Sequence, residues 1–200
     1  MMWVGLTGGI ASGKSAVSRF LREAGAFIID ADEIAHAVIL KGGPAYRSIA
    51  DAFGKEILGP SGEIDRKRLG EIVFNDPDKR RRLNHLVHPH VFERAEAEKE
   101  AITRRHPKAV IVFDAALLIE TGACRNMDWT LVVYVDRSTQ IERLTLRDGL
   151  TREQAEERIA AQMPLDEKIR FADEVIDNRK PLDQIKKEVF EIFRRLQRRA

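Results

Sequence analysis

The sequence has very little cysteine, no apolar run long enough to span a membrane, and no strong excess of charge of either sign. Its single cysteine, Cys124, excludes an internal disulfide framework and is typical of a protein kept in a reducing cytosol. The chain opens directly on a strand-like segment, without the basic stretch, apolar core and cleavage site of a secretion signal. We therefore expect a cytoplasmic protein with no membrane partner.

The charged side chains largely cancel one another. Lysine and arginine number 34 and aspartate and glutamate 32, which gives a formal net charge of +2 at pH 7. Nucleic-acid-binding domains usually carry a much stronger basic excess, so we expect no nucleic-acid partner. The 200 residues suffice for one α/β domain with a sizeable core and a smaller inserted lobe. No obligate protein partner is expected.

The sequence does contain a complete phosphate-binding loop near its start. The pattern G-x-x-x-x-G-K-[ST] is matched by GGIASGKS at residues 8–15. Glycines let the loop fold back so that its N–H groups point at phosphate, while Lys14 reaches the β and γ oxygens and Ser15 offers a hydroxyl to Mg²⁺. We therefore expect ATP with Mg²⁺, and the residues that should hold the nucleotide are Gly9, Ile10, Ala11, Ser12, Gly13, Lys14, Ser15 and Ala16.

Apolar stretches alternate with helical patterns along the whole chain. The expected strands are Trp3–Thr7, Ala26–Ile29, Ala109–Phe113, Thr130–Val135 and Glu174–Ile176. This alternation is typical of a parallel sheet with helices on both faces. We expect a three-layer α/β/α fold of the P-loop NTPase class with a five-stranded parallel sheet, whose carboxyl-terminal edge binds the ligand. The residues expected at that edge are Gly8, Asp30, Asp32, Asp114 and Asp136.

The segment between the second and third expected strands is too long for a simple crossover. Residues 33–106 hold helical patterns of their own, separated by glycine-rich breaks and by a further break at His88-Pro89. We expect a helical acceptor-binding lobe at 33–106 and a nucleotide-binding core at 1–32 and 107–200. Within the core, a helix pair at about 137–173 is interpreted as a lid, with Thr151 and Glu153 or Gln154 placed to cap its second helix.

Carboxylates at strand ends are the first catalytic candidates. Asp30 and Asp32 close the second strand, where a carboxylate either deprotonates an acceptor hydroxyl or caps the next helix. Asp32 is the better catalytic candidate of the two. Asp114 follows the third strand, where it either holds Mg²⁺ through a water molecule or is an exposed strand-end residue. Ala115 comes next, so the Asp-Glu pair of hydrolytic motor ATPases is missing.

Arginines and one histidine complete the set of candidates. Arg143, Arg147 and Arg158 can converge on the triphosphate from the lid, or form a solvated face paired with acidic neighbours. In the run Lys79–Arg82, consecutive residues lie about 100° apart on a helix, so at most two of them face a ligand. His88 is either a turn histidine or a polar contact to the acceptor.

In order and spacing, these segments resemble the dephospho-CoA kinase family over nearly the whole chain. The strings that carry the resemblance are LTGGI at 6–10, SGKS at 12–15, IDAD at 29–32, FG at 53–54, IDR at 64–66, LN at 83–84, HP at 88–89, LLIE at 117–120, QIER at 140–143, RD at 147–148 and ADEVIDN at 172–178. The resemblance implies transfer of the γ-phosphoryl group of MgATP to the ribose 3′-hydroxyl of dephospho-CoA. The products are CoA and ADP, in the last step of CoA biosynthesis.

The same resemblance implies a role for several residues. Asp32 becomes the general base and, with Lys14 and Arg143, forms the catalytic set, in which Arg143 stabilises the transferring phosphoryl group. Arg147 and Asn178 are implied on the nucleotide, Asn178 beside the adenine, and the substrate contacts implied besides Asp32 are Arg66, His88 and Leu117. The chain departs from the family at Ala11, where glycine is usual; alanine is harmless there only at negative φ.

Three other functions stay open at this point. Another small-molecule or nucleoside monophosphate kinase would share the core and lid and differ in its acceptor. A GTP-dependent switch would need an N-K-x-D or T-K-x-D string to recognise guanine, and the chain has neither. A nucleic-acid-associated ATPase would need a second acid after Asp114 and a strongly basic balance.

Overall fold

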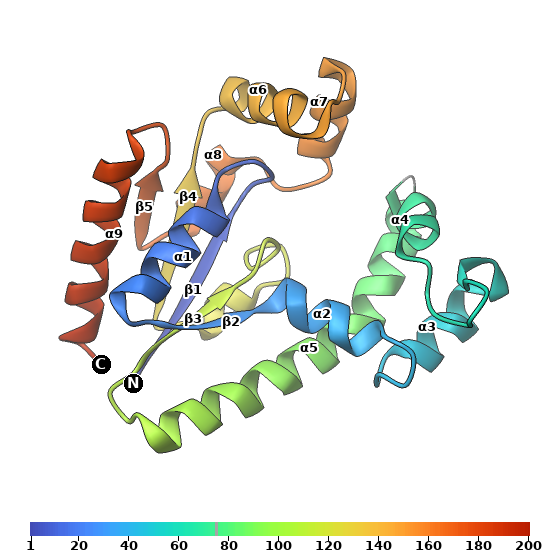
Figure 1. Cartoon of the computed structure of the whole chain (residues 1–200), viewed down its shortest axis with the longest axis horizontal. Coiled ribbons are helices and arrows are strands. Elements are labelled where there is room, and N and C mark those ends of the chain that lie inside the picture. Colours follow the sequence, from blue (N-terminus) through green and yellow to red (C-terminus); the bar gives the residue numbers. More distant parts are fainter. Residues whose placement is uncertain (75) are drawn as a thin grey trace. The chain divides into compact units, whose positions relative to one another are not determined.

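The computed structural model describes residues 1–74 and 76–200, with only the backbone of Phe74, and in this part of the chain five strands form one parallel sheet (Figure 1). The strands are β1 (Met2–Gly8), β2 (Phe27–Asp30), β3 (Val110–Asp114), β4 (Trp129–Tyr134) and β5 (Glu174–Asp177), in the order β2-β3-β1-β4-β5. The expected five-stranded parallel sheet is thereby confirmed. Asp30 and Asp114 belong to their strands and are register partners.

One face of the sheet is covered by two helices, α1 (Lys14–Ala24) and α9 (Leu182–Gln197), which contact each other (Figure 1). Apolar residues recur along α9 at helical spacing, so the helix buries one stripe against the sheet. That stripe consists of Ile185, Val189, Ile192, Phe193 and Leu196, which pack in one cluster with residues of β1, β3, β4 and β5. Residues of α1 join the same cluster, which therefore forms an apolar core between the sheet and the two helices.

The opposite face is covered by shorter segments. They are the turn after β3, the 3₁₀ helix η2 (Ala123–Asn126), α8 (Leu165–Lys168) and the 3₁₀ helix η3 (Ile169–Phe171), whose apolar residues pack with Val132 of β4. A Cβ atom added at Gly5 would lie 2.5 Å from a methyl group of Leu118, so glycine lets the segment after β3 lie close against β1. Sheet and coverings give the expected three layers.

The expected lid is a helix pair, α6 (Arg137–Asp148) and α7 (Arg152–Ala160). Asp136 caps α6 by accepting a hydrogen bond from the Thr139 N–H at 2.9 Å. Gly149 ends α6 with a left-handed backbone, φ 65°. Thr151 and Gln154 form a reciprocal capping box at the start of α7, as predicted. Below, the lid means residues 137–173.

The chain divides into two compact units. The first, called the nucleotide-binding unit below, is Met1–Asp30 with Lys99–Ala200, and the second is Ala31–Glu98. The second unit, called the lobe below, contains α2 (Ala31–Ile39), α3 (Tyr46–Phe53), the 3₁₀ helix η1 (Lys55–Ile57), α4 (Arg66–Phe74) and most of α5 (Pro77–Arg105). Its own buried residues include Ile49, Phe53, Ile57, Ile64, Leu69, Val87 and Val91. No helix in the described ranges is both long enough and apolar enough for a membrane span.

Two local predictions in the lobe are wrong. The break expected at His88-Pro89 is absent, because α5 runs through Pro89, and the alternative of a turn histidine at His88 is therefore wrong. Proline removes one backbone hydrogen bond, but Val87 and Val91 are buried on either side of it, and this packing holds the helix together. Asp32 likewise does not extend the second strand, since it lies in the first turn of α2.

Candidate phosphoryl-transfer site

The phosphate-binding loop leads from the end of β1 into the first turn of α1. Gly13, with φ 86°, precedes the helix, and a Cβ atom there would lie 1.9 Å from the Asn178 amide nitrogen, so only glycine fits. Within the described chain no side chain caps the start of α1. The exposed backbone N–H groups of a helix start, together with the positive end of the helix dipole, form an anion site.

Lys14 and Asp114 form an ion pair at this site. Lys14 begins α1 and Asp114 ends β3, so the pair joins the two elements that flank the expected triphosphate position. The Asp114 side chain is only 4% exposed, and the alternative of an exposed strand-end aspartate is therefore wrong. A lysine and a nearly buried carboxylate thus lie side by side next to the loop.

The residues predicted for Mg²⁺ have the chemistry of a magnesium site. Mg²⁺ prefers hard oxygen ligands and is usually held by one or two carboxylates together with substrate phosphates and waters. Ser15 is exposed in the first turn of α1, next in sequence to Lys14, whose ammonium contacts the Asp114 carboxylate. One hydroxyl and one carboxylate therefore fit an ion that arrives bound to the nucleotide.

Two glutamines of the lid hold the loop at Ile10. Gln140 of α6 donates its amide N–H to the Ile10 carbonyl at 2.7 Å, and Gln162, which follows α7, accepts from the Ile10 N–H at 2.8 Å. Gly9 allows this approach, because a Cβ atom there would lie 2.7 Å from the Gln140 nitrogen. Neither glutamine was predicted as a site residue. Nothing in the sequence distinguishes them from exposed lid glutamines.

Arg143 and Asn178 meet the same loop. The Arg143 guanidinium donates to the carbonyls of Ala11 at 3.2 Å, Ser12 at 3.3 Å and Asn178 at 2.9 Å. The buried Asn178 amide donates to the Ser12 carbonyl at 2.6 Å. The structure therefore brings both predicted residues to the loop. The donors of Arg143 point at backbone carbonyls, whereas the prediction directs them at the transferring phosphoryl group.

Arg147 and Arg158 are placed differently. Both pair with Asp148 at the end of α6, at 2.7 and 3.5 Å, and their side chains are 62% and 45% exposed. The Arg147 guanidinium is the main cause that lowers the pKa of Asp148. Asp136, expected at the ligand-binding edge, is used as a helix cap, and the hydroxyl of Ser138 with the N–H of Thr139 keeps its pKa well below the usual range.

Ala11 has the one positive φ among the non-glycine residues that the structure describes, at 59°. The condition for a harmless alanine at this position is therefore not met. A left-handed residue with a Cβ costs about 1–2 kcal/mol relative to the right-handed conformation. Its side chain packs with Ile10 against the lid cluster formed by Leu144, Ala155 and Ile159.

The predicted acceptor residues lie mostly in the lobe. Asp32 is exposed in the first turn of α2, and Arg66 is exposed at the start of α4. His88 is half-buried in α5, its ring edge-on to Phe92, and burial, with a smaller contribution from His85, lowers its pKa. Leu117, in the turn after β3, belongs to the nucleotide-binding unit and is half-buried.

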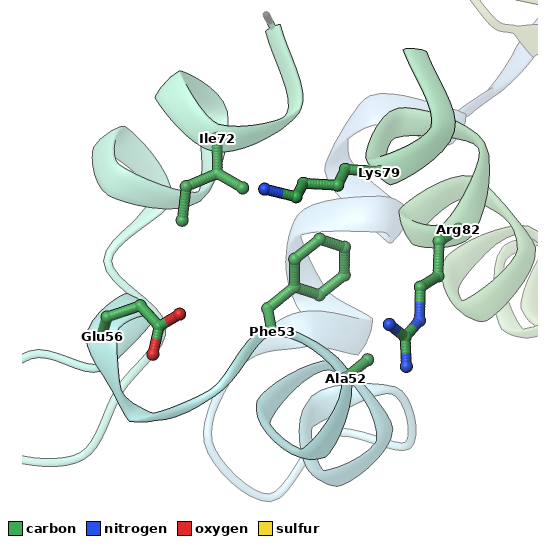
Figure 2. A pocket seen from close by; sticks show the side chains of 6 residues that line it. All are labelled: Ala52, Phe53, Glu56, Ile72, Lys79 and Arg82. Atoms are coloured by element: carbon green, nitrogen blue, oxygen red, sulfur yellow. The ribbon is translucent and has the colours of Figure 1, made fainter. Parts of the chain in front are cut away.

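The lobe also has a cavity of about 410 Å³ (Figure 2). Two members of the run 79–82, Lys79 and Arg82, line it from one side of α5, three residues apart. Arg81 pairs instead with Asp78 on the exposed surface. The remaining lining residues are Ala52, Phe53, Glu56 and Ile72. The cavity therefore combines apolar walls with two cations and one carboxylate.

Comparison with known proteins agrees with this geometry. The model of the dephospho-CoA kinase family matches residues 2–184. A dephospho-CoA kinase of Geobacter metallireducens is 50% identical over 194 residues, which cover 97% of this chain and 96% of the relative.

Solved structures agree as well. A crystal structure of a Thermus thermophilus protein matches with a TM-score of 0.81 and 30% identity, covering 98% of this chain and 97% of the other. A dephospho-CoA kinase from Campylobacter jejuni matches with a TM-score of 0.61 and 27% identity, covering 97% and 96%. With a family match over nearly its whole length and a phosphate-binding loop assembled as described, the chain belongs to the dephospho-CoA kinase family of ATP-dependent enzymes.

Proposed function

We propose that this chain transfers the γ-phosphoryl group of ATP to the ribose 3′-hydroxyl of dephospho-CoA, with CoA and ADP as products. The main support for the proposal is the geometry of the nucleotide-binding part of the site. The loop and the start of α1 lie beside the Lys14–Asp114 pair, in a chain that belongs to this kinase family. Phosphoryl transfer needs mainly positioning and charge stabilisation, which such a site supplies.

The nucleotide is held by the loop and its neighbours. The N–H groups of residues 9–16 and the Lys14 ammonium bind the β- and γ-phosphates. Arg143, whose guanidinium lies against the Ala11 and Ser12 carbonyls, stabilises the charge that develops during transfer. We also assign Asn178, whose amide donates to the Ser12 carbonyl of the loop, to the adenine side of the site.

The Ser15 hydroxyl and, through a water molecule, the Asp114 carboxylate would hold Mg²⁺. When bound with ATP, the ion neutralises the phosphate oxygens and favours the loss of ADP. The ion pair with Lys14 holds the nearly buried Asp114 carboxylate in place for this purpose.

Asp32 is the general base. Its exposed carboxylate, in the first turn of α2, accepts the proton of the 3′-hydroxyl while the oxygen attacks the γ-phosphorus and ADP leaves. ATP and the acceptor are the only reactants that this step consumes. Arg66, His88 and Leu117 are proposed as acceptor contacts.

We assign the cavity of the lobe to part of the acceptor. Dephospho-CoA carries a diphosphate and a long arm of amide and apolar groups, and a cavity lined by Lys79, Arg82 and the ring of Phe53 suits that mixture. This assignment makes Lys79 and Arg82, instead of Arg80 and Arg81, the members of the run that meet the substrate. We infer a cytoplasmic enzyme that needs no nucleic acid, membrane or obligate protein partner.

The test is ADP release by the purified protein with MgATP, comparing dephospho-CoA with AMP, CMP, adenosine and no acceptor. We expect release that depends on dephospho-CoA and on Mg²⁺, with CoA identified by mass. ADP release with a different acceptor alone would overturn the assignment of the substrate. Nucleotide binding without turnover on any acceptor would favour a nucleotide-dependent switch.

A further inference from the structure

Lys168 is a buried cation that the proposed mechanism does not use. It ends α8, just after the lid helices, and none of its side chain is exposed. A charged side chain is stable in such a place only when it is paired and its hydrogen bonds are satisfied. An ammonium group has three N–H donors, so three acceptors are needed.

Lys168 has three acceptors, which lie at the end of β1 and in the segment that follows β3. Its Nζ donates to the Ala116 carbonyl at 2.8 Å and to the Gly8 carbonyl at 3.5 Å, and it pairs with the Glu120 carboxylate at 2.9 Å. Gly8 ends β1 and begins the phosphate-binding loop. Ala116 lies two residues beyond Asp114. One ammonium thus joins the backbone of the loop to the backbone that follows Asp114.

The same junction has further hydrogen bonds. The Thr7 hydroxyl donates to the Ala116 carbonyl at 3.1 Å, and the Ala115 N–H donates to the Leu6 carbonyl at 3.0 Å. Thr7 is fully buried. Lys168 is therefore the charged member of a buried network that sets the spacing between the ends of β1 and β3.

Glu120 is the counter-charge of this network. Its carboxylate also accepts from the Met163 N–H at 3.2 Å, and its side chain is 22% exposed. Burial lowers the pKa of Lys168, and the hydrogen bond with Glu120 opposes that effect. Glu120 can thus be altered separately from the two carbonyl contacts, which lets the charge pair and the positioning role be tested apart.

We infer that Lys168 is a positioning residue of the nucleotide site, which holds the Gly8 and Ala116 carbonyls and so fixes the phosphate-binding loop relative to Asp114. The inference rests on ATP being the phosphoryl donor and does not depend on the acceptor. It predicts that loss of Lys168 weakens binding of MgATP more than it affects the acceptor. A mispositioning of about 1 Å costs up to about a hundredfold in such sites.

The experiment compares Lys168→Met, Glu120→Gln and the double variant by direct calorimetric binding of MgATP, by melting temperature and by steady-state KM for the acceptor. The matched control is Lys180→Met with Glu188→Gln, an exposed lysine–glutamate pair of the same unit at 2.7 Å. We expect Lys168→Met to raise the Kd for MgATP roughly ten- to a hundredfold and the acceptor KM less than about twofold. The control should leave the Kd for MgATP within about twofold of the wild type, because that pair is exposed. Glu120→Gln removes the counter-charge but keeps both carbonyl contacts of Lys168, so it should lower the melting temperature and leave the Kd for MgATP near the wild-type value.

The double variant decides between two roles. It removes the unpaired carboxylate that Lys168→Met leaves behind, so its melting temperature should recover while its Kd for MgATP stays raised. Recovery of the wild-type Kd would overturn the inference, because Lys168 would then only neutralise Glu120. Equal increases in the Kd for MgATP and the acceptor KM would overturn it too.

If Lys168→Met does not fold, the Kd of the double variant for MgATP tests the positioning role by itself. The Kd measurements do not depend on which acceptor the enzyme uses. An error in the proposed acceptor can therefore be distinguished from an error in the role of Lys168.

Discussion

The nucleotide-binding unit and the lobe fix their polar side chains in different ways. Around the loop, buried or half-buried side chains reach the backbone over long sequence distances: Gln140 bonds Ile10, Asn178 bonds Ser12 and Lys168 bonds Ala116. In the lobe, several exposed basic side chains pair within one helical turn, as Arg81 does with Asp78 and Arg94 with Glu98. The first arrangement is rigid and the second is weak and adjustable.

This difference has a consequence for catalysis. Groups that act on the transferring phosphoryl group must be held in place before the reaction, whereas groups that attract a flexible anionic acceptor need only supply charge. Substitutions near the loop should therefore act mainly on turnover and nucleotide binding. Substitutions of the lobe residues that line the cavity should act mainly on the acceptor KM. The proposed base Asp32, also in the lobe, is the exception and should act on turnover.

The largest effect is expected from Arg143→Gln. An arginine that stabilises a transferring phosphoryl group contributes about a thousandfold or more to kcat, so kcat should fall by at least that factor. The Kd for MgATP should change much less. Steady-state kinetics with calorimetric nucleotide binding measures both quantities.

The control for Arg143 is Asn178→Ala, which removes the amide bond to the Ser12 carbonyl but keeps the backbone carbonyl that Arg143 contacts. We expect it to weaken nucleotide binding and lower kcat far less. If the two variants lose nucleotide affinity alike and keep similar kcat values, Arg143 only braces the loop.

The second-largest effect is expected from Asp32→Asn. Removal of a general base costs about a hundred- to ten-thousandfold in rate, while the amide keeps the size of the side chain. We expect kcat to fall in that range and the Kd for MgATP to stay near the wild-type value. Glu33→Gln, on the neighbouring acidic residue of the same helical turn, is the matched control. Equal losses of kcat and nucleotide affinity would show that Asp32 is structural.

A smaller effect is expected from Arg82→Ser in the lobe. Loss of one cation from the cavity should raise the acceptor KM by roughly three- to tenfold, since a hydrogen bond to a charged group contributes about 1.5 kcal/mol or less when partly exposed. The KM for ATP should not change. Arg81→Ser removes the same charge outside the cavity and should alter neither constant. Equal effects of the two substitutions would mean that only overall charge matters.

Much of the fold follows from local sequence patterns. The five apolar stretches and the loop motif predicted the sheet, and no strand limit moved by more than one residue. The capping box at Thr151 was equally local. At Pro89 the local preference misled, because burial of Val87 and Val91 outweighs one lost hydrogen bond.

The site was predicted less completely than the fold. Residue type and spacing pointed to Lys14, Asp114 and Arg143, which the structure brings to the loop. Lys168 was missed because it follows Asp166 and Glu167, and a charged run normally indicates solvent-exposed surface. Its burial depends on contacts with residues more than fifty positions away, which no local pattern contains.

The smallest expected effect tests how firmly the loop is fixed. Ala11→Gly removes a left-handed strain of about 1–2 kcal/mol, but glycine loses more conformational entropy on folding, by about 0.5–1 kcal/mol. The net gain should be about 0.5 kcal/mol, which for a chain of this size raises the melting temperature by about 1–2 °C. Calorimetric unfolding measures it, and the Kd for MgATP should change less than about twofold.

Gly13→Ala is the opposite control for Ala11, because its Cβ atom would collide with the Asn178 amide and should destabilise the protein strongly. A lower melting temperature for Ala11→Gly would mean that the contact of the Ala11 methyl group with the lid cluster outweighs the strain. The alanine would then help to hold the lid against the loop. Apolar packing, as well as hydrogen bonds, would fix the side chains of the nucleotide-binding unit.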